Sequence, residues 1–151
     1  MTTPMIINWK KIDTSEDDEA DPTLYRQLIG SLMYLVNIRP NICYAVNTLS
    51  QFMVEPKRAH WATTKNVLRY LQGTIELGLK YTHSNDARLS GLTDANWVGS
   101  SVHRKSTSGY CFSLGLGMNS WCSMKQKSVA LSLVEAEYMA ANKTLCEAIW
   151  L

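Results

Sequence analysis

The sequence has no long hydrophobic run. Its longest apolar stretch, residues 31–36, is far shorter than the roughly 20 residues that a helix needs to span a bilayer. Residues 1–12 also lack a cationic segment followed by an apolar one, and they contain no small-residue cleavage site. We therefore expect no transmembrane helix, no membrane partner and no secretory signal, and we expect an intracellular protein of the cytoplasm or nucleus.

Cysteine and histidine are few, and neither shows the spacing of a metal site. The cysteines contain no Cys-x-x-Cys pair, and each stands in an apolar stretch. We therefore expect reduced, buried thiols rather than disulfides or zinc ligands. The residues concerned are Cys43, Cys111, Cys122, Cys146, His60, His83 and His103.

Charge is also sparse, at 19% of residues, and it is unevenly distributed. Residues 1–22 hold two lysines against six acidic residues, although the whole chain carries a net charge of +2, so the remainder is basic. The acidic stretch cannot bury enough apolar surface to offset its ordering entropy, so we expect residues 1–20 to be a flexible leader. The basic remainder suits a polyanionic partner, and a solvated surface explains the same charges.

The first periodic region, residues 21–75, predicts three helices in succession. Asp21 followed by Pro22 is typical of a helix start, and apolar residues then recur at helical spacing to about Asn37. Prolines at positions 40 and 56 interrupt the pattern, and Gly73 ends it. The expected buried stripes are Leu24, Leu28, Leu32, Leu35 and Val36 in the first helix, Ile42, Ala45, Val46, Leu49, Phe52 and Met53 in the second, and Ala59, Ala62, Val67, Leu68 and Leu71 in the third.

From Leu77 the apolar period changes to two, which is typical of half-buried strands. We expect strands at residues 77–82, 89–95, 109–114 and 119–124, forming a meander. Ser132 and Glu135 match a capping box, so a final helix should begin there and run to the end of the chain. The fold class is therefore α+β, a small helical unit followed by antiparallel strands and one helix. The expected buried stripe of the last helix is Val134, Tyr138, Ala141 and Leu145.

Two carboxylates are candidates for a metal site. Asp94 ends a strand of apolar or small residues, and Glu137 has Ala140 and Ala141 as helical neighbours, so it lies beside the expected stripe. A carboxylate in that place needs a partner, and a Mg²⁺ ion shared with Asp94 would provide one. An aspartate at a strand end is also commonly a cap, so the pattern by itself leaves both interpretations open.

The third expected helix has a basic face. Arg58, Lys65 and Arg69 are spaced seven and then four residues apart, so they share one side of the helix. That side suits contacts with phosphates, and it equally suits a surface in water. Both interpretations remain open at this point.

Five segments of the chain together resemble one family. In the same order, they are similar to the late reverse-transcriptase region and the following ribonuclease H region of copia-type retrotransposon Pol polyproteins. The resemblance covers essentially everything after the acidic stretch. The segments are DPTLYRQLIGSLMYL at 21–35, VLRYLQGT at 67–74, RKSTSGY at 104–110, SWCSMKQ at 120–126 and EAEYMA at 135–140.

The resemblance implies a domain organisation. After the leader at 1–20, residues 21–75 would be a helical thumb-like or connection-like part of the reverse transcriptase. Residues 76–151 would be a truncated ribonuclease H-like domain, namely its first half. In that fold the strand that carries Asp94 is central, so here its outer edge would be unpaired. We therefore expect self-association through this edge and marginal stability.

The resemblance also implies chemistry. Ribonuclease H degrades the RNA of an RNA–DNA hybrid with four acids around two Mg²⁺ ions. By motif match Asp94 is the first acid and Glu137 the second, whereas the third and fourth would come after Leu151. Glu135 and Glu147 are too far round or along the helix to substitute. We therefore expect a chain that is catalytically incomplete, binds Mg²⁺ weakly or not at all, and lacks the polymerase carboxylates, which lie further upstream in the family.

Some positions depart from the commonest family pattern and put activity in doubt. Asn41 and Asn96 stand where aspartate is frequent, and Leu133 and Val134 replace a small polar pair. Two alternatives to a ribonuclease fragment therefore stay open: a nucleic-acid-binding remnant, and a repurposed interaction or effector protein. The remnant would bind a hybrid or another nucleic acid through Arg58, Lys65, Arg69, Arg104 and Lys105.

Overall fold

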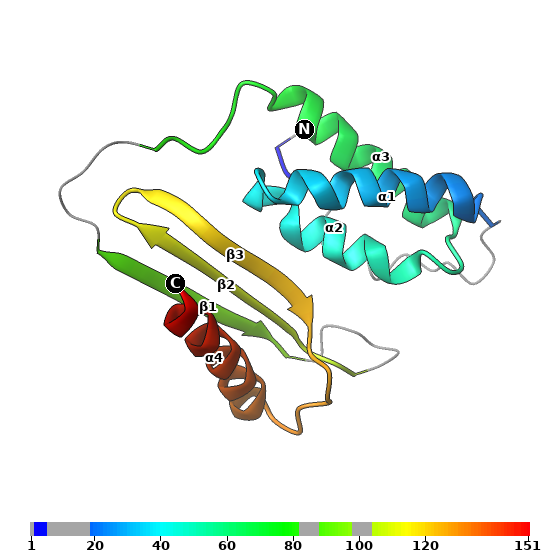
Figure 1. Cartoon of the computed structure of the whole chain (residues 1–151). Coiled ribbons are helices and arrows are strands. Elements are labelled where there is room, and N and C mark those ends of the chain that lie inside the picture. Colours follow the sequence, from blue (N-terminus) through cyan, green and yellow to red (C-terminus); the bar gives the residue numbers. More distant parts are fainter. Residues whose placement is uncertain (1, 6–18, 82–87, 98–103) are drawn as a thin grey trace. The chain divides into compact units, whose positions relative to one another are not determined.

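A computed structural model describes residues 2–5, 19–81, 88–97 and 104–151. The chain forms two compact units, Met1–Gly78 and Leu79–Leu151. The first unit is helical and the second combines a sheet with one helix, so the α+β prediction is confirmed (Figure 1). The elements are α1 (Pro22–Val36), η2 (Pro40–Ile42), α2 (Cys43–Leu49), η3 (Ser50–Phe52), α3 (Arg58–Gly73), β1 (Leu89–Asn96), β2 (Thr107–Leu114), β3 (Gly117–Lys125) and α4 (Leu133–Trp150).

Helix α1 begins where the sequence predicts. The Asp21 carboxylate accepts hydrogen bonds from the backbone N–H groups of Thr23 at 2.7 Å and Leu24 at 3.3 Å, and Pro22 occupies the first turn. The second predicted helix is divided, because two short 3₁₀ turns, η2 and η3, flank the seven residues of α2. Pro40 lies at the start of η2, where its missing N–H costs no helical hydrogen bond.

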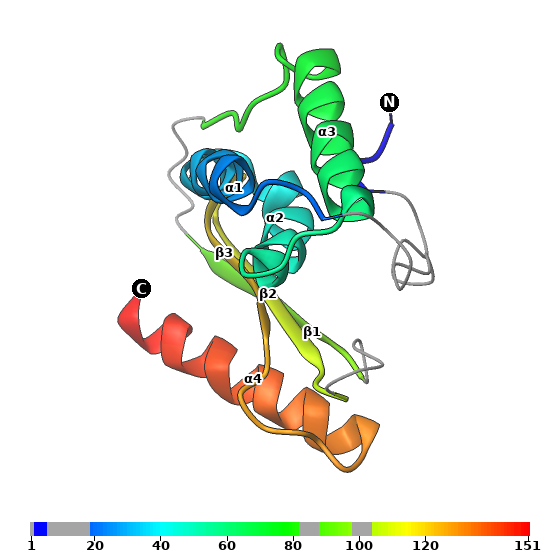
Figure 2. The ribbon, with the colours of Figure 1, turned by 90° about the vertical axis from the view of Figure 1, so that its right-hand side faces the viewer.

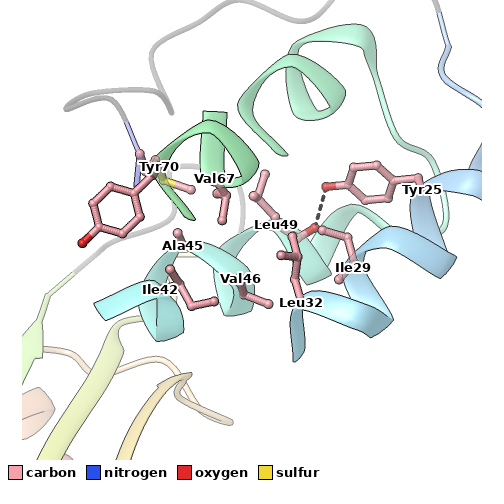
Figure 3. Packing of buried hydrophobic residues seen from close by; sticks show 10 residues of the cluster. Tyr25, Ile29, Leu32, Ile42, Ala45, Val46, Leu49, Val67 and Tyr70 are labelled. Atoms are coloured by element: carbon pink, nitrogen blue, oxygen red, sulfur yellow. Dashed lines mark hydrogen bonds between the residues drawn. The ribbon is translucent and has the colours of Figure 1, made fainter. Parts of the chain in front are cut away.

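The core of the first unit gathers side chains from α1, α2 and α3 (Figure 3). On α1 the buried face is centred on Tyr25, Ile29 and Leu32, whereas the expected Leu24 is 52% exposed. Tyr25 can turn inward because its hydroxyl donates a hydrogen bond to the Leu49 carbonyl at 2.9 Å, so no polar group is buried unpaired. The predicted stripe of α1 was therefore wrong by one position at its N-terminal end. The buried core residues are Met5, Tyr25, Ile29, Leu32, Ile42, Ala45, Val46, Leu49, Val67 and Tyr70.

Helix α3 buries polar side chains where apolar ones were expected. Thr63 and Thr64 are buried, and their hydroxyls donate to the carbonyls of Ala59 and His60 at 2.8 and 2.9 Å. His60 is also buried, and its imidazole accepts from the Lys57 N–H at 3.0 Å and stacks on Phe52 with centroids 3.8 Å apart. The expected burial of Ala62 and Leu68 was wrong, because both are exposed.

Two short parts of the expected leader, residues 2–5 and 19–20, lie in the described part of the chain, and both contact the first unit. Met5 is buried in the core of the first unit. At the other end, the Ala20 N–H donates to the Pro56 carbonyl at 2.9 Å, and Glu19 pairs with Lys57 through a β-bridge and an ion pair of 3.7 Å. Residues 1 and 6–18 lie outside the described part of the chain.

The second unit contains an antiparallel sheet in the order β1-β2-β3. The register pairs Asp94 of β1 with Gly109 of β2 and Thr107 of β2 with Lys125 of β3. A strand had also been expected at 77–82, but residues 77–81 form no strand, and Thr82 lies outside the described residues. Tyr81 approaches the sheet by its side chain instead, since its hydroxyl donates to the Met118 carbonyl at 2.7 Å.

Helix α4 packs on β1 and β2, along one face of the sheet (Figure 2). Its buried residues are Ala136, Ala140 and Thr144, which recur every four residues and face the strands. The predicted stripe of Val134, Tyr138, Ala141 and Leu145 is exposed, so the helix is rotated relative to the expectation. Small side chains let the helix approach the sheet closely, whereas the larger ones point away from it.

No helix in the described ranges is both long enough and apolar enough to cross a membrane.

Candidate functional site

Asp94 lies on β1, two residues before the strand ends, and its side chain is exposed. Its two neighbours face α4: the Thr93 hydroxyl accepts a hydrogen bond from the Thr144 hydroxyl at 2.8 Å, and Ala95 packs in a cluster with Ala136. Side chains alternate between the two faces of a strand. The carboxylate of Asp94 therefore projects from the face of the sheet opposite α4.

Glu137 lies on α4, next to the buried Ala136, and is half-buried. It is seven residues from Thr144, so the two side chains are about 20° apart around the helix. Because Thr144 contacts Thr93 of β1, Glu137 lies on the side of α4 that is nearer to β1. The two candidate acids therefore come from elements that pack together but lie on different sides of the sheet surface.

A shared Mg²⁺ ion would need both carboxylates directed at one point, because hard cations bind several oxygen ligands at once. Asp94 projects from the far face of the sheet, whereas Glu137 lies on the helix that covers the near face. Within the described ranges, no group of three or more His, Cys, Asp or Glu side chains is placed to hold a metal ion. The assignment of Asp94 and Glu137 as metal ligands stays a prediction from the resemblance.

The other glutamates of α4 have partners of their own. One Glu135 carboxylate oxygen accepts from the Leu131 N–H at 2.6 Å, and the Glu135 N–H donates to the Ser132 hydroxyl at 3.1 Å. This is a variant of the predicted capping box, with Leu131 in place of the cap residue's own N–H. Glu147 accepts from the Ser120 hydroxyl at 2.7 Å. Both carboxylates are engaged in positioning α4.

The basic face of α3 is exposed and adjoins a groove. Arg58, Lys65 and Arg69 are all exposed, and the Lys65 ammonium lies 5.7 Å from the centroid of the Trp61 ring. Arg69 donates to the Asn66 side-chain oxygen at 3.2 Å. A groove of about 560 Å³ runs between this face and the start of α1, and Arg69 is outside its lining. The lining residues are Glu19, Ala20, Asp21, Leu24, Arg58, Trp61, Ala62 and Lys65.

The other two predicted basic residues belong to the second unit. Arg104 is exposed, has a left-handed backbone with φ of 50°, and lines a small hollow with Trp97 and Leu131. Lys105 lies close enough to Lys125 to affect its ionisation. Partial burial, together with the positive charge of Lys105, lowers the pKa of Lys125. The pairing of Thr107 with Lys125 brings the two lysines together, which the sequence pattern did not reveal.

Gln126 is a buried residue whose role the sequence did not suggest. Its amide nitrogen donates to the Ser108 hydroxyl at 2.8 Å and to the Ala136 carbonyl at 2.9 Å, and its backbone N–H donates to the Ser106 carbonyl at 2.8 Å. It therefore ties the end of β3 to β2 and to α4. The only available signal was its place at the end of the SWCSMKQ segment.

Thiol positions also differ from the prediction. Cys43 is buried and Cys111 and Cys122 are half-buried, but Cys146 is exposed on α4, so the expectation that all four would be buried was wrong.

Burial raises the pKa of Tyr110 to about 12, and the nearby Cys122 and Glu147 contribute to the rise.

Comparison with known proteins identifies the family. The chain is 42% identical over 151 residues to the retrovirus-related Pol polyprotein from transposon RE2 of Arabidopsis thaliana, and 43% identical over the same length to that from transposon RE1. The chain belongs to the copia-type retrotransposon Pol polyproteins. The family prediction is thus confirmed. No protein-family model and no solved structure matches the chain.

This Pol-related chain spans only part of those relatives. The matches cover 100% of the chain and 10% of each Arabidopsis polyprotein. A different relative is nearly its own size: the secreted RxLR effector protein 161 of Plasmopara viticola is 48% identical over 128 residues, which cover 84% of the chain and 90% of the effector. The chain is therefore similar to proteins that are named for quite different roles.

Proposed function

We propose that residues 21–75 derive from the reverse-transcriptase region of a Pol polyprotein and residues 76–151 from the front part of its ribonuclease H domain. The end-to-end match to the polyproteins is the observation that carries this proposal. The order of the elements in the second unit supports the proposal, because three antiparallel strands are followed by a helix that packs against the first strand. Asp94 and Glu137 stand at the motif positions of this strand and this helix.

We further propose that a polypeptide of residues 1–151 does not cleave RNA–DNA hybrids and holds Mg²⁺ weakly or not at all. Two-metal hydrolysis needs carboxylates that clamp both the attacking and the leaving oxygen. Asp94 projects from the face of the sheet opposite α4, which carries Glu137, and Glu135 and Glu147 have other hydrogen-bond partners. The ribonuclease ancestry concerns the origin of the sequence, whereas the lack of cleavage concerns what this polypeptide does.

The test is cleavage of a labelled RNA–DNA hybrid in the presence of Mg²⁺. We expect the same background for the natural sequence, Asp94→Asn and Glu137→Gln, since no assembled site is lost in the variants. Circular dichroism of each sample ensures that the protein is folded. Cleavage by the natural sequence that disappears in Asp94→Asn would overturn the inactivity and would support a site completed in another arrangement.

Nucleic-acid binding without cleavage is the second candidate. The Lys65 ammonium above the Trp61 ring, with Arg58 lining the same groove, favours it, because cations beside an aromatic face suit phosphates and bases. Glu19 and Asp21 line the other side of the groove and oppose a polyanion there. Nucleic-acid binding therefore requires contacts on the exposed face of α3, away from Glu19 and Asp21.

Fluorescence anisotropy with a labelled hybrid at several salt concentrations tests this candidate. Replacing one phosphate-contacting lysine should reduce the salt slope by about 1. We expect Lys65→Glu to weaken binding and reduce the slope, and the exposed Lys127→Glu of the second unit to change neither. Equal effects of the two variants would indicate binding through overall charge and would contradict a face on α3.

A repurposed interaction protein is the third candidate, and its support is the match to the Plasmopara viticola effector over 90% of that protein's length. Such a role needs no catalytic acid. It predicts that Asp94→Asn and Glu137→Gln leave protein binding unchanged.

A further inference from the structure

The face of the sheet opposite α4 carries a row of hydrogen-bond donors where β2 begins and β3 ends. The register pairs Asn96 of β1 with Thr107 of β2, and Thr107 with Lys125 of β3. Cross-strand partners share one face of a sheet, with Cβ atoms about 4.5–5.5 Å apart. Ala95 packs with residues of α4, so its neighbour Asn96 projects from the opposite face, and the rest of the row does so too. We call Asn96, Thr107 and Lys125 the donor row.

A second lysine adjoins the donor row. Lys105 precedes Thr107 by two residues, and both Lys105 and Lys125 are half-buried. Partial burial lowers the pKa of Lys125, and the positive charge of Lys105 lowers it further. Two ammonium groups this close repel each other, and partial burial strengthens the repulsion because less water screens it. An anion bound between them would turn this repulsion into attraction.

The backbone beneath the two lysines is held in place. Ser106 and Gln126, which follow Lys105 and Lys125 in the chain, are both buried. The Gln126 N–H donates to the Ser106 carbonyl at 2.8 Å, and the Gln126 side-chain nitrogen donates to the Ala136 carbonyl of α4 at 2.9 Å. The backbone at the two lysines is therefore fixed before a ligand arrives, which lowers the ordering cost of binding.

Asn96 makes the donor row suitable for an anion. Aspartate is frequent at this position in the family, and its carboxylate would repel a negative ligand, whereas the asparagine side chain offers N–H donors. Asp94 projects from the same face and opposes an anion. It lies two residues along β1, about 6–7 Å from Asn96 by the rise of a strand, and its cross-strand partner is Gly109. Its exposed charge is screened by water and salt at that distance.

We propose that the donor row and Lys105 together bind a dianionic phosphate group. Two ammonium groups balance its two negative charges, and the hydroxyl of Thr107 and the amide of Asn96 supply further donors to its oxygens. Partly exposed ion pairs contribute little each, so we expect a Kd on the order of 1 mM. Inorganic phosphate and the terminal phosphate of a nucleic-acid strand both present this chemistry, whereas the phosphodiesters within a strand carry a single charge.

Titration of inorganic phosphate into the isotope-labelled 151-residue chain tests the proposal. At constant ionic strength, we expect saturable shifts of the backbone amide signals of Thr107 and Lys125, and none with chloride. Lys125→Gln should weaken binding about tenfold, because one charge-assisted hydrogen bond is lost, whereas Lys125→Arg keeps the charge and should retain binding. Lys143→Gln is the matched control, since it removes the same charge from α4, on the other side of the sheet, and should leave the Kd unchanged.

A second pair of variants tests the role of Asn96. Asn96→Asp places a carboxylate in the donor row and should also weaken phosphate binding about tenfold, through like-charge repulsion. Asn119→Asp adds the same charge to an exposed position near the other end of β3 and should have little effect. Circular dichroism of each variant checks that the sheet and helices are intact.

Two oligonucleotides that differ only in a terminal phosphate or a terminal hydroxyl distinguish the two sources. Tighter binding of the phosphorylated strand, lost in Lys125→Gln, would assign the site to strand ends. Equal binding of both strands, beside saturable binding of inorganic phosphate, would assign it to the free anion. The proposal is overturned by the absence of saturable phosphate binding, or by equal weakening in Lys125→Gln and Lys143→Gln. None of these outcomes depends on hybrid cleavage or on the basic face of α3, so the proposed functions are tested independently.

Discussion

Tyr25 illustrates how single residues determine the helical core. Its ring is fully buried, and its hydroxyl donates to the Leu49 carbonyl, so it links α1 to the end of α2 (Figure 3). Leucine is more hydrophobic than tyrosine, so the sequence pattern predicted that Leu24 is buried, whereas the adjacent Tyr25 is the buried residue. The same holds for Thr63 and Thr64 of α3, whose hydroxyls are satisfied by carbonyls of the preceding turn and so can be buried.

Removing the Tyr25 hydroxyl should destabilise the first unit. In Tyr25→Phe the Leu49 carbonyl loses its buried donor, which costs about 1–3 kcal/mol. Chemical denaturation followed by circular dichroism measures the change. Tyr34→Phe, on the exposed side of the same helix, is the control and should stay within about 0.5 kcal/mol.

Tyr25 should also make the first unit sensitive to alkali. Burial raises the pKa of its phenol from 10.0 to about 12. Because the folded pKa lies above the unfolded value, the neutral phenol contributes stability that is complete below pH 10 and is lost as the pH rises toward 12. Melting temperatures across this range should fall less steeply in Tyr25→Phe. An equally steep fall in the variant would show that another group is responsible.

At the scale of elements, the sequence predicted where α1, α3, β1, β2, β3 and α4 lie but not which side of α4 faces the sheet. Two apolar stripes compete on that helix, one of small residues and one of large residues. Hydropathy favours the large stripe, whereas close packing on the strands selects Ala136 and Ala140. A period of 3.6 residues cannot distinguish the two, because both stripes fit it.

Two adjacent alanines of α4 give a direct test of this orientation. Ala140 is 1% exposed and Ala141 is exposed. Ala140→Leu should force a large side chain against the sheet and cost about 1–3 kcal/mol. Ala141→Leu adds the same atoms on the exposed side of α4 and should be neutral or slightly stabilising, as measured by urea denaturation. The reverse ranking would mean that the helix is rotated as the sequence pattern suggested.

The candidate site was predictable only in part, and the reason also lies at this scale. The strand and the helix that carry Asp94 and Glu137 were placed correctly by pattern. The direction of the Asp94 side chain depends on which alternate residues of β1 face α4. Thr93 and Ala95 face it because of packing on α4, and the strand's own residues do not reveal this. The proximity of Lys105 to Lys125 likewise depends on the hairpin register, which pairs Thr107 with Lys125.

At the scale of the whole molecule, the two units have cores of different kinds. Among the described residues, the buried cluster of the first unit has ten members, including Tyr25 and Ile29, whereas that of the second consists of Ala95, Ala130, Ala136 and Ala140, with Phe112 buried outside it. Burying alanine removes much less apolar area from water than burying isoleucine or tyrosine. The second unit should therefore be the less stable of the two.

Differential scanning calorimetry should resolve two transitions, with the second unit unfolding at the lower temperature. Ile29→Ala removes buried methylene and methyl groups, costs about 2–5 kcal/mol, and should lower only the upper transition. Ala136→Gly weakens α4 by about 1 kcal/mol and should lower only the other. A single transition that both variants shift equally would mean that the chain unfolds as one cooperative body.

The pair of lysines at the end of the hairpin has a chemical consequence. An amine reacts with acylating reagents only when it is unprotonated, and the pKa of Lys125 is lowered by partial burial and by the charge of Lys105. At mildly alkaline pH, Lys125 therefore holds a larger unprotonated fraction than an ordinary surface lysine does. Limited acylation followed by peptide mapping should label Lys125 more readily than its surface position suggests, and its reactivity should decrease in Lys105→Ala.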